Sequence, residues 1–415
     1  MISFDSESDP DSGGGGIHPV RSGAAPWRKP ETELATIHLS GGTACDVLIV
    51  GAGITGAMTA EALTRQGLSV LVVDRAMPGR GSTAASTAML LWEIDTPLVE
   101  LADLYGFDKA ASIYRRSLAA VHDLGALVEG LGLACRYAPR PSLYLAEPSA
   151  APDSLLPELL ARRRAGLPGE ALDRGALMAR FGIDRPSALM AGGAAEADPL
   201  LLAHGLLSRA FERGARFVAD EVVGYDRLSR GGAARLASGA FIEAGTIILA
   251  TGYDMPDFVA SDLHRIVSTW CIATPPQDAA RLWRDRALIW EAGEPYLYAR
   301  LDAENRLIVG GEDAEILDAA ERERRMPEKA AALVKRMRTL QPQLAYEVSS
   351  AWTAAFGETV DGLPLIGPVP GAPGMLAAYG YGGNGITFSF MASRMIAAMV
   401  AGEPRAWFED FALDR

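Results

Sequence analysis

The chain has 415 residues, 49% of them hydrophobic and 22% charged, which is enough for two or three hydrophobic cores. Its 39 basic and 52 acidic residues give a net charge of −13, which argues against a nucleic-acid partner because phosphate backbones attract basic surfaces. Three widely separated cysteines predict neither a disulfide framework nor a thiolate zinc site and favour the cytoplasm. The longest apolar stretch, 47–63, contains glycines, threonines and Glu61, so no transmembrane segment is expected.

The first 43 residues show no sustained hydrophobic period. We expect residues 1–43 to form an extended N-terminal arm, partly disordered over its acidic, glycine-rich first sixteen residues. That composition is the opposite of a secretory signal, which begins with basic residues followed by an apolar core.

A βαβ unit follows the arm. Asp46–Val50 is a short apolar run typical of a strand buried on both faces, and the segment from Ile54 to Gln66 has a helical pattern that Gly67 ends. Ser69–Asp74 predicts a second buried strand.

Helices are expected to dominate the next region. Apolar residues recur at helical spacing over 97–131 and again in stretches of 154–180, while the pattern around 136–146 is strand-like. Asp198 followed by Pro199 is typical of a capped helix start, and this helix should run to about Arg213.

The remaining chain is predicted to be rich in strands. The elements expected there are strands at 216–228, 246–251, 265–274, 288–291, 295–301, 306–310, 347–356 and 361–367, and helices at 319–339 and 386–401.

The glycine motif Gly51-Ala-Gly53-Ile-Thr-Gly56 lies where a dinucleotide fingerprint belongs, between a buried strand and a helix. Its glycines allow a tight turn, close approach of a pyrophosphate and close packing of helix on strand. The free N–H groups of the helix start attract the anion. Asp74, which ends the second strand, can accept from ribose hydroxyls and would repel the 2′-phosphate of NADP.

Two later segments favour FAD over NAD. Thr251 and Gly252 end a buried strand, which brings a second turn to the same crevice. The run Gly380-Tyr-Gly-Gly-Asn-Gly385 leads into the last helix and forms a second glycine-rich helix start. A flavin uses such a site because its pyrimidine edge becomes negative on reduction.

With these motifs, the sequence resembles the D-amino-acid-oxidase-like (DAO) family of FAD-dependent oxidoreductases, which includes glycine, sarcosine and gamma-glutamylputrescine oxidases. The resemblance covers nearly all of the chain from residue 45 onward. It rests on DVLIVGAGITGAMTAEAL at 46–63, GSTAAST at 81–87, ATG at 250–252, DGLPLIGP at 361–368 and AYGYGGNGIT at 378–387.

The resemblance implies an α/β fold in which a Rossmann-like FAD-binding domain is interleaved with an α+β substrate domain built on an antiparallel sheet. The FAD-binding domain is expected at 44–125, 195–260 and 355–415, and the substrate-binding domain at 126–194 and 261–354.

It also implies which residues bind the cofactor. One group would bind the ADP half, a second the ribityl chain and flavin, and a third, near the C-terminus, the pyrimidine edge. These residues are Gly51, Gly53, Ile54, Thr55, Gly56, Asp74, Arg75, Val222, Thr251 and Gly252; then Gly81, Ser82, Thr83, Ser86 and Thr87; and finally Gly382, Gly383, Asn384, Gly385, Ile386 and Thr387.

Relatives with a covalent flavin carry a His soon after the GST turn or a Cys in the late strand before DGLP. Here those positions read Ala84-Ala85 and Ala351-Trp352-Thr353, so we expect FAD to be held without a covalent bond.

Candidate substrate-binding residues come from the strands of the second half. Tyr296, Tyr298 and Arg300 alternate and so share one face of a strand, and Trp352 is a candidate aromatic wall. Arg300 can bind a substrate carboxylate through two parallel hydrogen bonds. It can equally pair with Asp302 or Glu312 and order the sheet, and the sequence leaves both interpretations open.

These features predict an FAD-dependent oxidoreductase that oxidises the C–N bond of a small amine or amino acid. Hydride transfer to flavin N5 gives an imine, so the protein needs no nucleophile and no metal. The electron acceptor, oxygen or a quinone or protein, stays open. One alternative is a flavin-binding subunit that needs a partner. The other, a pyridine-nucleotide-dependent flavoprotein, would need a second fingerprint or a cysteine pair, and the sequence has neither.

Overall fold

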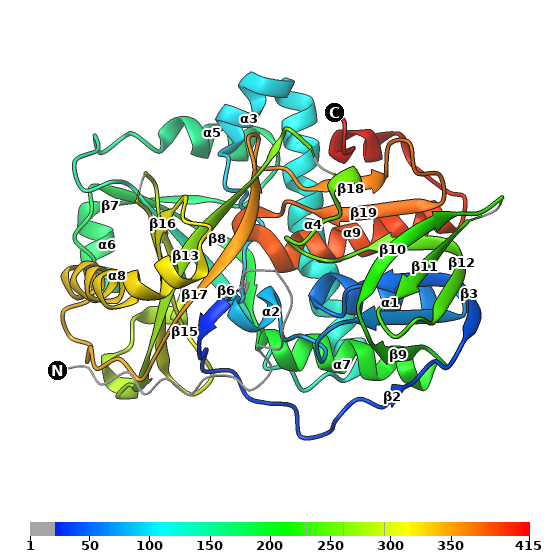
Figure 1. Cartoon of the computed structure of the whole chain (residues 1–415). Coiled ribbons are helices and arrows are strands. Elements are labelled where there is room, and N and C mark those ends of the chain that lie inside the picture. Colours follow the sequence, from blue (N-terminus) through cyan, green and yellow to red (C-terminus); the bar gives the residue numbers. More distant parts are fainter. Residues whose placement is uncertain (1–20, 230, 260, 294) are drawn as a thin grey trace.

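The computed structural model describes residues 21–415 except 230, 260 and 294. The disorder expected at the start of the chain falls outside the described residues. Two large sheets lie side by side (Figure 1). One is built around β13 (His264–Pro276) and β17 (Ser350–Thr359), and the other around β3 (Gly42–Val50) and β12 (Phe241–Leu249). No helix in the described part of the chain has the length and apolarity needed to cross a membrane.

The sheet built around β3 and β12 is mostly parallel, in the order β10-β11-β12-β3-β4-β9-β2, with β19 also paired to β12 and β18 to β19. Its central strands are continuous runs of valine, leucine and isoleucine that are almost fully buried, as a sheet covered on both faces requires. The strands are β2 (Thr36–Ile37), β3 (Gly42–Val50), β4 (Val70–Asp74), β9 (Arg216–Ala219), β10 (Val222–Arg227), β11 (Gly232–Leu236), β12 (Phe241–Leu249), β18 (Leu365–Pro368) and β19 (Met375–Tyr379).

Three helices from distant parts of the sequence pack together beside this sheet. Helix α1 (Ile54–Arg65) contacts both α7 (Pro199–Glu212) and α9 (Gly385–Val400). Helix α7 begins as predicted, with the Asp198 carboxylate accepting from two backbone N–H groups. The fingerprint helix and the C-terminal helix are therefore neighbours (Figure 1).

The helix expected over 97–131 is broken in two. Helix α3 (Leu98–Tyr105) and helix α4 (Phe107–Leu131) are separated by Gly106, whose φ of 82° lies in the left-handed region that favours glycine. The hydrophobic pattern of the sequence does not reveal the break at Gly106, because α3 and α4 both bury apolar residues at the same helical spacing.

The second sheet is largely antiparallel, in the order β1-β17-β13-β16-β15-β14-β6-β8-β5, with β7 paired to β8. The strands are β1 (Arg21–Gly23), β5 (Met89–Leu90), β6 (Ala138–Leu145), β7 (Glu170–Asp173), β8 (Ser187–Glu196), β13 (His264–Pro276), β14 (Leu288–Glu291), β15 (Leu297–Leu301), β16 (Arg306–Ala314) and β17 (Ser350–Thr359). Helices α2 (Ser82–Ala85), α5 (Leu156–Arg164), α6 (Arg174–Phe181) and α8 (Ala319–Leu340) complete the fold.

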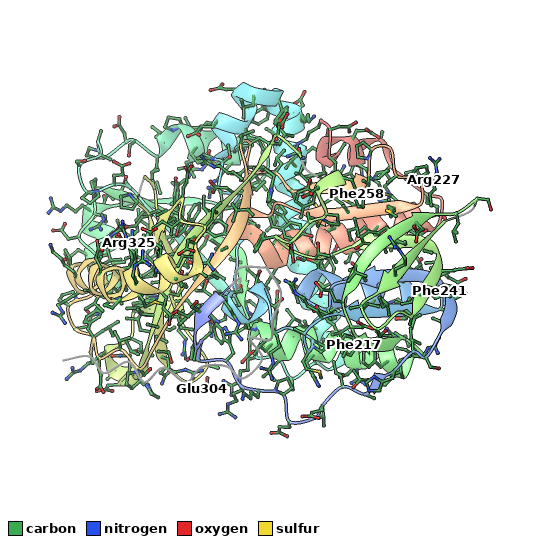
Figure 2. The ribbon with its side chains drawn as sticks, viewed as in Figure 1. Phe217, Arg227, Phe241, Phe258, Glu304 and Arg325 are labelled. Atoms are coloured by element: carbon green, nitrogen blue, oxygen red, sulfur yellow. The ribbon has the colours of Figure 1, made fainter. Side chains whose placement is uncertain are left out.

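Helix α8 covers one face of this sheet. It is highly charged, yet Met326, Leu333 and Met337 are buried against the strands, while Arg325 points away from them (Figure 2). The opposite face of these strands is left to line the interior of the molecule, where the site described below lies.

Two sequence expectations need correction. The strand expected at 216–228 is two strands, because β9 pairs with β4 whereas β10 turns away to pair with β11. The sheets also cross the expected domain limits: β5 and the last residues of β17 lie in ranges assigned to the cofactor domain, yet both belong to the antiparallel sheet.

The described part of the N-terminal arm bridges the two sheets. Strand β1 pairs with β17 at one end, and β2 pairs with β9 at the other. Between them, Arg306 donates to the carbonyl of Pro26, and Glu304, on the side of the molecule where the arm runs, pairs with Arg28 (Figure 2). The arm is thus an integral strap across the interior.

Candidate cofactor and substrate site

A large cavity of about 2480 Å³ lies between the two sheets. Its walls come from the turns after β3, β4 and β12, from α2, from the start of α9, from strands of the antiparallel sheet and from the strap. Sites for one small molecule are typically about 300–1,000 Å³, so this cavity has room for a dinucleotide together with a substrate.

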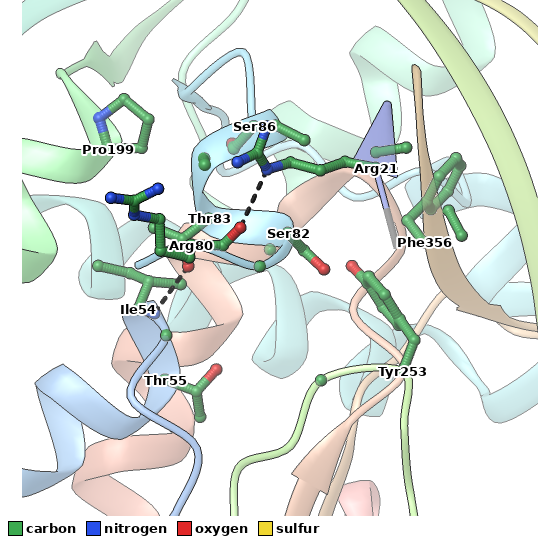
Figure 3. A pocket seen from close by; sticks show the side chains of 18 of the residues that line it. Arg21, Ile54, Thr55, Arg80, Ser82, Thr83, Ser86, Pro199, Tyr253 and Phe356 are labelled. Atoms are coloured by element: carbon green, nitrogen blue, oxygen red, sulfur yellow. Dashed lines mark hydrogen bonds between the residues drawn. The ribbon is translucent and has the colours of Figure 1, made fainter. Parts of the chain in front are cut away.

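The glycine loop between β3 and α1 is shaped by its own backbone. Gly51 has a φ of 109°, and a Cβ on Gly56 would come within 1.9 Å of the carbonyl oxygen of Gly51. Gly53, the cap residue of α1, has no side-chain cap, while the neighbouring N–H of Ile54 donates to Oγ1 of Thr83 at 2.9 Å (Figure 3). The loop is therefore packed as closely as the fingerprint interpretation requires, with Gly56 buried behind it.

Asp74 bonds to this loop directly. Its Oδ2 accepts from the N–H of Ala52 at 2.7 Å and its Oδ1 from that of Ala76 at 2.9 Å. Burial raises the pKa of the carboxyl, and the two backbone hydrogen bonds oppose that rise. The next residue, Arg75, pairs with Asp254 at 2.8 Å.

The second glycine-rich helix start lies beside the first. The Oγ1 of Thr55 in α1 is 2.8 Å from Oγ of Ser389 in α9, and it also donates to the hydroxyl of Tyr381. Asn384 and Thr387 hold the start of α9 against the chain after α2, because both donate to the carbonyl of Leu91. The two motifs, more than 300 residues apart, thus meet on one cavity.

The cavity collects nearly all of the predicted cofactor residues. Only Gly56 and Thr387 lie behind its surface, where they pack the loop and the helix start. The predicted residues that line it are Gly51, Gly53, Ile54, Thr55, Asp74, Arg75, Gly81, Ser82, Thr83, Ser86, Thr87, Val222, Thr251, Gly252, Gly382, Gly383, Asn384, Gly385 and Ile386.

Arg300 does not reach the cavity, so its interpretation as a carboxylate ligand is not supported. Its guanidinium, 2% exposed, donates to Glu196 and to the backbone carbonyls of Thr87 and Ala197. The geometry fits the alternative interpretation, in which Arg300 orders the sheet. Its acidic partner is Glu196, however, and neither Asp302 nor Glu312 accepts a hydrogen bond from it.

Trp352 is also absent from the cavity surface. Its indole N–H donates to the carbonyl oxygen of Ala85 at 2.9 Å, and its ring packs with Trp27 and Ala85. The expected aromatic wall is therefore a support that fixes α2 against β17.

Tyr296 and Tyr298 do line the cavity, with ring centroids 5.7 Å apart. The hydroxyl of Tyr298 lies 3.4 Å from Oγ1 of Thr269 and 3.6 Å from Sγ of Cys271. Burial raises the pKa of both tyrosines well above its usual value, so both phenols stay protonated at neutral pH.

The structure adds cavity residues that sequence reasoning missed. Tyr253, whose ring points toward Ser82, and Phe356 both line the cavity (Figure 3). Asp95 lines it too and accepts from the N–H of Gly383 at 2.6 Å. Their only sequence signal was closeness to the recognised motifs: Tyr253 follows Gly252, and Asp95 follows the GSTAAST segment.

Curated proteins match the chain along most of its length. It is 25% identical over 378 residues to gamma-glutamylputrescine oxidoreductase of Escherichia coli, covering 89% of this chain and 86% of that protein. It is 22% identical over 371 residues to the probable oxidoreductase OrdL of Haemophilus influenzae, covering 86% and 83%.

Solved structures share the fold. Glycine oxidase from Geobacillus kaustophilus superposes with a TM-score of 0.74 at 22% identity, covering 90% of this chain and 99% of that one. Iminodiacetate oxidase from Chelativorans sp. gives 0.71 at 23% identity, covering 88% and 98%. The family model described as FAD dependent oxidoreductase (DAO) matches residues 46–399. This chain therefore belongs to the DAO family of FAD-dependent oxidoreductases.

Proposed function

We propose that the protein oxidises the C–N bond of a small amine or amino acid, with non-covalently bound FAD as the immediate hydride acceptor. The observation that carries this proposal is the meeting of two glycine-rich helix starts on one cavity whose far wall is aromatic. The names of the curated relative from E. coli and of the solved glycine oxidase support an amine or amino-acid substrate.

The residues present fit FAD. In the glycine loop, a Cβ on Gly51 would meet the backbone of Ala250 and a Cβ on Gly53 would crowd the hydroxyl of Thr83, so glycine keeps the loop closely packed. The start of α1 presents its positive end to a pyrophosphate. Asp74 and Val222 lie at the end of the cavity that would hold the adenosine, and Gly382 to Ile386 at the start of α9 would hold the flavin.

When bound, FAD supplies the hydride acceptor for C–N oxidation. The protein's part is to orient the amine, keep its reacting nitrogen unprotonated and exclude water. Tyr296 and Tyr298 suit this part, because their protonated hydroxyls can donate hydrogen bonds while their rings exclude water. None of these tasks needs a nucleophilic side chain.

Non-covalent binding is supported by the chemistry of the nearby side chains. Positions 84–85 and 351–353 carry no His or Cys, and Cys271 is buried with its thiol pKa raised to about 12 by that burial. Denaturing the yellow protein with acid should release free FAD into the supernatant. Flavin that stays with the precipitated protein would contradict this part of the proposal.

The activity is tested by mixing the FAD-loaded protein anaerobically with amines and amino acids while the visible flavin band is monitored. Bleaching identifies the substrate class, and readmission of oxygen then separates an oxidase from a dehydrogenase that needs a quinone or protein acceptor. A flavin that no amine or amino acid bleaches would favour a subunit that needs a partner, and bleaching by NADH alone would favour the pyridine-nucleotide alternative. Location in the cytoplasm stays a prediction.

A further inference from the structure

Most charged side chains that line the cavity gather near the dinucleotide loop, and they include both signs. Arg75 and Arg80 follow β4, and Asp74, Glu221 and Asp254 line the same region. Arg21 lies on β1, which pairs with β17 of the antiparallel sheet, and it donates to the carbonyl of Arg80. The described residues of β13, β14, β15 and β17 that line the opposite end are uncharged, among them Thr269, Trp290 and Tyr298. A carboxylate bound there would find no basic partner from these strands.

Two carboxylates lie at this opposite end. Asp95 lines the cavity and accepts one hydrogen bond, from the N–H of Gly383. Asp313 is half-buried beside the hydroxyls of Thr269 and Tyr296, and its Oδ1, shielded from solvent, has no hydrogen-bond partner. Neither carboxylate forms an ion pair with any residue that the structure describes, although the many acidic side chains elsewhere in this sheet are paired with arginine or lysine.

A bulge in β16 brings Asp313 to the cavity side of the sheet. Gly311 and Glu312 have φ values of 134° and 60°, and the register with β13 shifts at this point. As a result Glu312 points to α8, where it pairs with Lys329 and Arg336, and the following residue, Asp313, faces the other way. Bulges next to active sites commonly redirect a side chain in this manner.

Tyr296 lines the cavity near both carboxylates. Its pKa is raised first by burial and then by the charges of Asp313 and Asp95, so its ring is within electrostatic reach of both. With Tyr298 it offers two aromatic faces, which attract cations. Unpaired carboxylates beside aromatic faces are the chemistry that binds an ammonium group.

We propose that Asp95 and Asp313, with Tyr296, bind a second positive charge on the substrate, so that the enzyme prefers a diamine or polyamine to an α-amino acid. The inference rests on the proposed function, since it assigns the substrate class of the same cavity. A second ammonium group supplies the partner that both carboxylates lack, and a substrate carboxylate would be repelled by them.

The test compares three amines of equal carbon number on the FAD-loaded protein: putrescine, butylamine and γ-aminobutyrate. The dissociation constant, taken from the concentration dependence of anaerobic flavin bleaching, should be lowest for putrescine and highest for γ-aminobutyrate. Relative to butylamine, Asp95→Asn and Asp313→Asn should each weaken putrescine binding roughly tenfold or more, as loss of a hydrogen bond to a charged group does. Asp103→Asn removes the same charge from the exposed surface of α3 and should change nothing.

A second measurement does not depend on turnover. The bis-quaternary analogue of putrescine has no nitrogen lone pair and cannot form an imine, so its binding is followed by calorimetry. It should bind the wild-type protein and bind both Asn variants more weakly. In the Asp95→Lys variant, γ-aminobutyrate should bind more tightly than butylamine, which is the reverse of the order expected for the wild-type protein. Equal binding of putrescine and butylamine, or binding of the analogue that both variants retain, would overturn the inference. If no amine bleaches the flavin but the analogue still binds through Asp95, the proposed function fails and the cation site stands.

Discussion

Nη1 of Arg300 donates to Oε2 of Glu196 at 3.0 Å, and both side chains are only 2% exposed. The pair joins β15 to the end of β8, and the same guanidinium donates to the carbonyl of Thr87 just after α2. An arginine on a strand next to the candidate substrate wall therefore organises the wall and does not face the substrate.

We expect Arg300→Met to act on stability. It leaves a buried carboxylate with one fewer partner, and breaking such a pair typically costs about 3–5 kcal/mol of unfolding free energy. Urea denaturation measures the loss. Arg174→Met, which breaks an exposed pair with Asp184, should change the stability far less. A variant of normal stability that loses only carboxylate-bearing substrates would restore the ligand interpretation.

Gly56→Ala should yield a protein that does not hold FAD. The new Cβ would approach the carbonyl oxygen of Gly51 to 1.9 Å, and backbone cannot move aside without opening the glycine loop. The flavin-to-protein ratio after purification measures the effect. Gly130→Ala, on α4 with open space around it, should retain full flavin content. Full flavin content in Gly56→Ala would show that the loop is not the dinucleotide site.

Trp27→Ala should speed the release of FAD. Trp27 is 9% exposed, packs with Ala85 of α2 and lines the cavity, so it closes the strap over the site. Replacing a buried Trp by Ala usually costs about 3–5 kcal/mol, which should loosen the strap before it unfolds the sheets. The rise of free-flavin fluorescence after dilution gives the release rate. Glu31→Ala, exposed on the same strap, is the control, and equal rates in the two variants would argue against a closing role.

Binding of the bis-quaternary cation should weaken as the pH falls through about 6. Burial raises the pKa of Asp95 and of Asp313 to about 6, so both are ionised above this value and become neutral below it. The other groups that face them are Tyr296, which stays protonated, and Glu358, which is paired with Arg265. The ligand carries fixed charges, so calorimetry between pH 5 and 8 reports the protein alone. Affinity that rises on acidification would contradict the assignment.

Much of the fold was predictable because it depends on patterns of a few neighbouring residues in the sequence. Runs such as Val47–Val50 and Val70–Val73 are uniformly apolar, which is typical of strands in a sheet covered on both faces. The glycine spacing at 51–56 and at 380–385 likewise marks two helix starts, because only glycine meets the steric limits of each turn. In both cases the reason lies within a few neighbouring residues.

The sequence by itself thus determined most of the strands, the fingerprint loop and the glycine-rich segments that reach the cavity surface. Only the tertiary structure decided which polar side chains face the cavity. Arg300 finds Glu196 more than one hundred residues away, and Asp313 faces inward because a bulge at Glu312 shifts the alternation of β16 by one residue. Strand pairing and register determine which side chains face the cavity. Both depend on contacts between segments far apart in the sequence, which a local sequence pattern does not reveal.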